Sequence, residues 1–131
     1  MIFVSNLPWT ISIQRVKQPE GKTSLGFYVS CNKGDKSTWS CEAVVEQRLL
    51  PVLKDMRVKA KRGSIDVYRR ATSEMGYPNF LDWDDLVDVN KGYMSSDGKA
   101  TFQISVDVKS VQQNSNEELS EPKQTLTHTY T

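Results

Sequence analysis

The sequence has little of the chemistry on which most enzyme and metal sites depend. Its 131 residues include one histidine and two cysteines, whereas a structural zinc site needs about four ligands of these kinds close together. Cys31 and Cys41 fall on the apolar phase of the alternation described below, where a free cysteine usually behaves as a small hydrophobic residue; a disulfide between them is the alternative. A glycine-rich phosphate loop and a serine nucleophile motif are both missing. We therefore expect no catalytic residues, no metal and no cofactor.

An excess of one charge and a long apolar run are missing as well. Seventeen basic residues (Lys+Arg 17) face sixteen acidic ones (Asp+Glu 16), and the net charge is +1. Because nucleic-acid-binding domains are usually strongly basic, we expect no nucleic acid partner. No apolar run approaches the ~20 residues that a membrane-spanning helix needs, so we expect no membrane association. The first residues lack a signal-peptide pattern and cysteines are few, which predicts a nuclear or cytoplasmic location.

The acidic residues between positions 82 and 88 do not match a calcium-binding loop. An EF-hand loop that starts at Asp82 needs a glycine at its sixth position and a glutamate at its twelfth. Those two positions hold Val87 and Tyr93. We interpret the acidic residues as the solvated face of a short helix.

Strand patterns dominate the chain. Apolar and polar residues alternate with a period of two around residues 9–13, 25–31, 39–49, 65–67 and 102–108, which is typical of half-buried strands. Short polar turns such as 32–36 and 95–98 separate several of them. This pattern predicts an all-β, antiparallel sandwich of about seven or eight strands. Apolar residues at helical spacing predict one short helix near residues 81–88.

The C-terminal part changes in character. We predict a sandwich over residues 1–111 and a polar linker over residues 112–123, which is acidic and lacks periodicity. The last residues, 124–131, are rich in threonine and alternate again, which favours a strand.

Basic residues gather between positions 54 and 70. As a structural feature, they would form a charged edge strand that resists aggregation; as a functional feature, they would attract acidic ligands. Both interpretations stay open for this basic cluster, which comprises Lys54, Arg57, Lys59, Lys61, Arg62, Arg69 and Arg70.

Several of these segments together resemble a known family. They are Phe3–Ile11, which contains Asn-Leu-Pro-Trp, the pair Leu25–Asn32 and Thr38–Cys41, and Gly76–Phe80 followed by Trp83 and Lys91-Gly92-Tyr93. In this combination they resemble the MATH, or TRAF-like, domain, and particularly the substrate-recognition domains of ubiquitin-specific proteases. The resemblance covers residues 2 to 110 and implies a TRAF-like β-sandwich.

The resemblance also implies a binding site. Family members bind short extended peptides along an edge strand, which corresponds here to residues 74–79. Met75 stands where the family has a tryptophan, and a family arginine falls near Arg15 or Val16. The implied peptide-binding residues are Arg15, Tyr28, Arg62, Ser64, Glu74, Met75, Gly76, Tyr77, Pro78 and Asn79.

The function implied is that of a non-catalytic module that recruits substrates to a ubiquitin-specific protease by edge-strand addition. Its partners would be short peptide segments of the Pro/Ala/Glu-x-x-Ser kind. The parent protein would then be a cysteine deubiquitinase, although this chain would not itself be an enzyme. The alternatives are the MATH domain of a BTB-type ubiquitin-ligase adaptor, or an oligomerisation or scaffold domain, and the oligomeric state stays open.

The tail departs from the family pattern. The first strand of the family should precede Phe3 and is missing there, whereas residues 124–131 resemble it. We therefore expect this segment to complete a sheet, either in a permuted arrangement or as a strand swapped between molecules. The alternative is an unordered tail.

Overall fold

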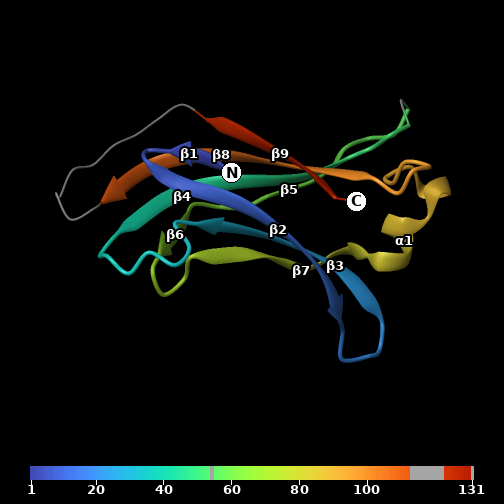
Figure 1. Cartoon of the computed structure of the whole chain (residues 1–131), viewed down its shortest axis with the longest axis horizontal. Coiled ribbons are helices and arrows are strands. Elements are labelled where there is room, and N and C mark those ends of the chain that lie inside the picture. The colour runs from blue at the N-terminus through green and yellow to red at the C-terminus, as the bar shows by residue number, and fades with distance from the viewer. Residues whose placement is uncertain (54, 113–122, 131) are drawn as a thin grey trace.

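A computed structural model of the chain describes residues 1–53, 55–112 and 123–130. Two antiparallel sheets stack face to face (Figure 1), which confirms the predicted all-β sandwich. The first sheet has the order β1-β2-β3-β7 and consists of β1 (Ile2–Val4), β2 (Leu7–Lys17), β3 (Thr23–Cys31) and β7 (Glu74–Asp82). The second has the order β5-β4-β8-β9 and consists of β4 (Ser40–Leu50), β5 (Lys59–Arg62), β8 (Ala100–Gln112) and β9 (Gln124–Tyr130), and β6 (Asp66–Arg69) also pairs with β4.

The core forms because alternate side chains of each strand point between the sheets. On β3, Leu25, Phe27 and Val29 are buried. The ring of Phe27 meets Phe102 of the opposite sheet edge-on at 5.2 Å between centroids and lies 5.1 Å from Phe80. Such edge-to-face pairs add to the burial of the rings themselves. Phe27 therefore stands at the centre of the contact between the two sheets.

One end of the sandwich carries the helical segment (Figure 1). α1 (Trp83–Val87) buries Trp83 and Leu86, and a 3-10 helix, η1 (Val89–Lys91), follows it. The predicted short helix near 81–88 is thus confirmed. Among the described residues no helix is long and apolar enough to cross a membrane. The same part of the chain contains no group of three or more side chains placed to hold a metal ion.

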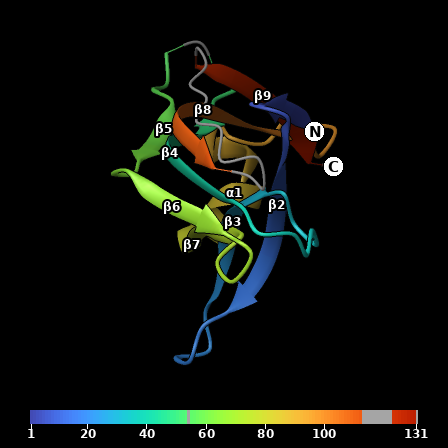
Figure 2. The same cartoon turned by 90° about the vertical axis from the view of Figure 1, so that its left-hand side faces the viewer.

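The β5 and β6 strands share one edge of β4. β5 pairs with residues 46–49 and β6 with residues 40–43. In Figure 2, β6 and β7 lie one above the other on the same side of the sandwich. A cavity lies between the two sheets on this side, which we call the open side, and residues of β4, β6 and β7 line it.

β9 lies on the opposite side and pairs with residues 100–106 of β8. Most of its residues are exposed, and only Leu126 and Tyr130 pack partly against the core. The Tyr130 ring meets Trp83 edge-on at 5.9 Å. Almost all of the predicted linker, residues 113–122, and also Thr131 lie outside the described residues, so the division into three segments stays a prediction.

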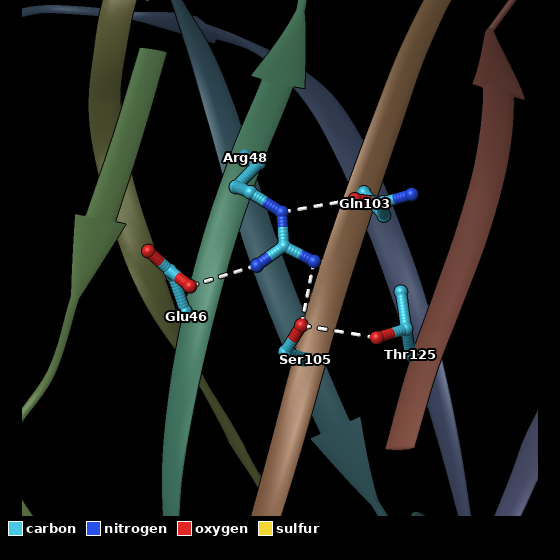
Figure 3. Close-up of polar contacts among 5 residues, drawn as sticks. All are labelled: Glu46, Arg48, Gln103, Ser105 and Thr125. Carbon is cyan, nitrogen blue, oxygen red and sulfur yellow. Dashed lines mark hydrogen bonds and ion pairs between the residues drawn. The ribbon is translucent and has the colours of Figure 1, made fainter. Parts of the chain in front are cut away.

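A polar network on the outer face of the second sheet connects β4, β8 and β9 (Figure 3). The Arg48 guanidinium donates to Gln103 Oε1 at 2.9 Å, to Ser105 Oγ at 2.5 Å and to Glu46 Oε2 at 2.8 Å. Ser105 Oγ in turn lies 3.1 Å from Thr125 Oγ1 on β9. Because the network includes side chains from three adjacent strands, it favours the register in which β9 pairs.

Both cysteines are buried in the core and free. A hydrogen bond with Cys41, together with burial, raises the pKa of the Cys31 thiol. A catalytic cysteine instead needs a lowered pKa, because the thiolate is the nucleophile. These thiols therefore act as small hydrophobic side chains in the contact between the sheets.

Candidate functional site

The outer edge of β7 has no strand beside it in the described structure, because β7 is the last strand of its sheet. The register with β3 pairs Ser30 with Glu74 and Tyr28 with Gly76. The amide of Cys31 donates to the carbonyl of Ser73 at 2.8 Å. In an antiparallel ladder the hydrogen-bonded pairs alternate with pairs whose backbone groups point away from each other.

This alternation assigns the direction of each backbone group on β7. Met75 and Tyr77 direct their N–H and C=O groups toward β3. Glu74 and Gly76 direct theirs away from it, toward the open side. Two residues thus offer two donors and two acceptors in the spacing that an added antiparallel or parallel strand requires.

Gly76 allows β7 and β3 to approach closely. A Cβ atom at this position would overlap the carbonyl oxygen of Phe27 and would lie 2.7 Å from the Cα of Tyr28. Only glycine therefore fits here without moving one strand. The absence of a side chain also leaves the backbone of Gly76 exposed to an incoming chain.

A cavity of about 180 Å³ opens beside this edge, between the two sheets. Its walls combine apolar and aromatic side chains with a few polar groups, as ligand sites usually do. At its inner end, the Nε2 of the buried Gln47 donates to the Phe27 carbonyl at 2.8 Å and so ties β4 to β3. The cavity is lined by Val45, Gln47, Gly63, Asp66, Tyr68, Met75, Gly76 and Tyr77.

Lys61 of β5 lies over the ring of Tyr77, which lines the cavity. Its ammonium lies 4.7 Å from the centroid of the Tyr77 ring and 5.3 Å from that of Phe80, within the range of a cation–π contact. The sequence prediction chose Arg62 and missed Lys61. The structure shows why Lys61 points inward: it pairs with the inward residue Gln47, and paired residues share one face of a sheet.

The carboxylate of Glu74 lies on the outer face of the first sheet. It accepts hydrogen bonds from Ser30 Oγ at 2.9 Å and from Lys33 Nζ at 3.3 Å, both on Oε2. The side chain stays 29% exposed. A ligand that lies along β7 can therefore reach this carboxylate from solvent, and a ligand hydroxyl can donate to it.

The structure brings together five of the predicted residues. Met75 and Tyr77 point into the cavity, while Glu74 and Tyr28 lie on the outer face on either side of Gly76. The Tyr28 ring lies over Gly26, where a Cβ atom would come within 2.8 Å of it. These residues form a continuous surface around the free edge, which we call the β7 edge.

Arg62 and Ser64 lie near this surface, on either side of Gly63, which lines the cavity. Both side chains are exposed. They border the open side from the second sheet. Their predicted role in binding stays a prediction.

The remaining predicted residues lie apart from the free backbone groups. The carbonyl of Pro78 already accepts from Ser24 Oγ at 2.6 Å, and proline has no N–H to donate, so the free stretch ends before it. Asn79 is exposed next to it. Arg15 lies over the Trp83 ring at 5.3 Å and borders a separate cavity with Asp82 near the helical end.

Comparisons with known proteins match the part of the chain that contains this site. The model of the MATH domain matches residues 2–109. Ubiquitin carboxyl-terminal hydrolase 7 of Drosophila melanogaster is 31% identical over 106 residues, which are 80% of this chain and 9% of the hydrolase. BTB and MATH domain-containing protein 38 of Caenorhabditis elegans is 28% identical over 91 residues, 67% of this chain and 23% of that protein. The chain thus spans a minor part of either relative, and β9 lies beyond the residues that the MATH model matches.

Proposed function

The chain belongs to the MATH domain family, and we propose that it is a non-catalytic module that binds extended peptide segments along β7. MATH domains are protein-interaction modules, and the part of hydrolase 7 that this chain resembles is its MATH region. The observation that carries the proposal is the unpaired outer edge of β7, where Glu74 and Gly76 direct their backbone groups outward beside a cavity.

The mechanism is strand addition. The ligand backbone pairs with Glu74 and Gly76, and this pairing supplies affinity that does not depend on sequence. Alternate ligand side chains then point into the cavity between Met75, Tyr68 and Tyr77, where their size and polarity are selected. Since such a contact buries little surface, we expect micromolar affinity, about −8 kcal/mol or weaker.

Two charged groups give the site its selectivity. The Glu74 carboxylate accepts a hydrogen bond from a ligand hydroxyl, in addition to those from Ser30 and Lys33. The Lys61 ammonium over Tyr77 attracts an acidic ligand residue at the other end of the stretch. This arrangement supports ligands of the Pro/Ala/Glu-x-x-Ser kind. Met75 provides a flexible apolar surface and accepts small side chains there.

The proposed role is to recruit substrates or partners to a ubiquitin-specific protease. The likeness to hydrolase 7 supports this assignment, because it extends over 80% of the chain. The second candidate is substrate binding for a BTB-type adaptor, which the likeness to the BTB and MATH domain-containing protein supports over 67% of the chain.

A titration of the isotopically labelled chain with a Pro/Ala/Glu-x-x-Ser peptide, followed by amide NMR, tests the proposal. We expect saturable shifts at residues 74–77 and at Tyr28. Replacing the ligand serine with alanine removes the hydroxyl that donates to Glu74, so this peptide should bind about tenfold more weakly. No shifts at millimolar peptide would contradict this ligand class.

A pair of protein variants isolates the role of the carboxylate. Glu74→Ala should weaken the binding of the serine peptide about tenfold and leave the binding of the alanine peptide unaffected. A hydrogen bond to a charged group is lost only in the first case. Glu42→Ala, an exposed glutamate on β4, is the matched control and should bind both peptides as the parent chain does. Equal weakening of both peptides by Glu74→Ala would rule out the hydroxyl contact.

A further inference from the structure

The turn between β6 and β7 presents two consecutive arginines. Arg69 and Thr72 close this turn, since the Thr72 amide donates to the Arg69 carbonyl at 2.9 Å and the reverse bond measures 3.4 Å. Arg70 follows at the tip and is exposed, as is Arg69. β7 and its free edge begin two residues after the turn, at Glu74.

A second cavity lies against this turn. Its volume is about 340 Å³, which exceeds the about 180 Å³ of the cavity beside the β7 edge. The segment that leads into β4 forms the other wall and contributes two hydroxyl groups and an indole. We call it the Arg69–Arg70 pocket; it is lined by Ser37, Thr38, Trp39, Arg69, Arg70 and Ala71.

The charges of this pocket are not neutralised from within. Among the described residues, neither arginine forms an ion pair with a carboxylate. The Nη1 of Arg70 donates to the Lys36 carbonyl at 3.0 Å, which fixes the side chain over the loop. The acid of that loop, Asp35, accepts from the amide and hydroxyl of Ser37 at 2.7 and 2.6 Å. Its carboxylate keeps its charge and lines a neighbouring cavity together with Arg70, but among the described residues it forms no ion pair with Arg70.

Trp39 provides an independent observation. The residue is only 5% exposed. Three buried polar atoms have no partner among the described residues, Ser5 Oγ, Trp9 Nε1 and Trp39 Nε1, and of these three residues Trp39 lines the pocket. Buried donors are almost always paired in proteins, so an unpaired one calls for an explanation. An acceptor that enters the pocket beside the indole would explain it.

We propose that the Arg69–Arg70 pocket binds an oxyanion, and that its natural source is a phosphorylated serine or threonine next to the segment that pairs with β7. Two guanidinium groups, the Thr38 hydroxyl and an unpaired indole N–H form the donor set that a phosphate group needs. The identity of the ligand rests on the proposed peptide-binding function. An extended chain advances ~3.3 Å per residue, so about three ligand residues beyond Glu74 would reach the turn.

Titration with inorganic phosphate, read from the indole N–H signal of Trp39, tests the pocket without any peptide. We expect a saturable shift in the millimolar range, weakened about tenfold by Arg70→Gln because a charged hydrogen-bond donor is lost. The matched control is Arg57→Gln, an exposed arginine in the loop 51–58 at the opposite end of the sandwich (Figure 1), which should titrate as the parent chain does. Equal titration of both variants, or no saturable shift, would show that the pocket does not bind phosphate.

A second arm tests the source of the oxyanion. Two versions of the Pro/Ala/Glu-x-x-Ser peptide carry a phosphothreonine three residues before or after the motif, and matched peptides carry threonine or glutamate instead. One phosphorylated version should bind about tenfold more tightly than its threonine form, and Arg70→Gln should remove the gain. If phosphate binds but neither phosphorylated peptide binds more tightly than its threonine form, the pocket binds an oxyanion that does not come from a phosphorylated peptide. Missing shifts at residues 74–77 would instead count against the β7 edge alone.

Discussion

Gly76 determines whether β7 can lie close enough to β3 to leave a regular free edge. We predict that Gly76→Ala destabilises the fold by about 1–3 kcal/mol, because its Cβ would overlap the Phe27 carbonyl and the strands must separate. Urea unfolding measures this change. Gly63→Ala is the control, since a Cβ there meets its nearest atoms only at 3.6 Å, and it should change stability by no more than ~0.5 kcal/mol. Equal effects of the two variants would contradict the close approach.

Asp35 gives the loop before β4 a dependence on pH. The hydroxyl of Ser37, and then its backbone amide, lower the pKa of the Asp35 carboxyl below its ordinary value. A carboxyl with a lowered folded pKa stabilises the fold above its unfolded pKa, and this contribution is lost as the pH falls through the folded value. We predict that Ser37→Ala raises the Asp35 pKa, measured by NMR titration, and leaves the lowered pKa of Asp97 unchanged. A shift of both pKa values would contradict the local cause.

The residue scale also shows why part of the site escaped prediction. The strand that contains Gly76 and Tyr77 was found because its residues resemble a family motif. Lys61 was missed because β5 has four residues, too few to show which of them face inward, and its pairing with Gln47 is known only from the structure. The cavity wall formed by Asp66 and Tyr68 depends on which sheet β6 joins. No local pattern in a four-residue strand specifies that choice.

At the scale of elements, β9 depends on polar contacts more than on burial. We predict that Arg48→Met destabilises the fold by about 1–3 kcal/mol, because it removes the bonds to Glu46, Gln103 and Ser105. Hydrogen exchange should accelerate in β9 beyond the change in global stability. Arg57→Met, in the exposed loop after β4, should have neither effect. Unchanged exchange in β9 would mean that the network does not hold this strand.

The long strands were predictable because each has one buried face. β3, β4 and β8 have at least nine residues each, and the apolar alternation within them, over residues 25–31, 39–49 and 102–108, is long enough for its period to be recognised. The short strands β1, β5 and β6 have three or four residues each. A period of two cannot be recognised over so few positions, and their pairing depends on the neighbours that the fold supplies.

At the scale of the molecule, the side bordered by β7 and the side bordered by β9 have different roles. The first leaves the edge of β7 free beside a cavity. On the second, β9 pairs with the edge of β8 and is the last strand of its sheet, and most of its residues are exposed. We therefore predict a monomer in sedimentation experiments over a wide range of concentrations. A dimer that forms with rising concentration would favour the scaffold alternative, or a β9 strand exchanged between two copies.

Hydrogen exchange at single amides along β7 tests strand addition most directly. In the free chain, the amides of Met75 and Tyr77 should exchange slowly because they pair with β3, and those of Glu74 and Gly76 should exchange fast. Saturation with a Pro/Ala/Glu-x-x-Ser peptide should slow the exchange of the Glu74 and Gly76 amides and leave that of the Met75 and Tyr77 amides unchanged. Binding that leaves Glu74 and Gly76 fast, or that protects another strand instead, would contradict the assignment of the β7 edge as the peptide site.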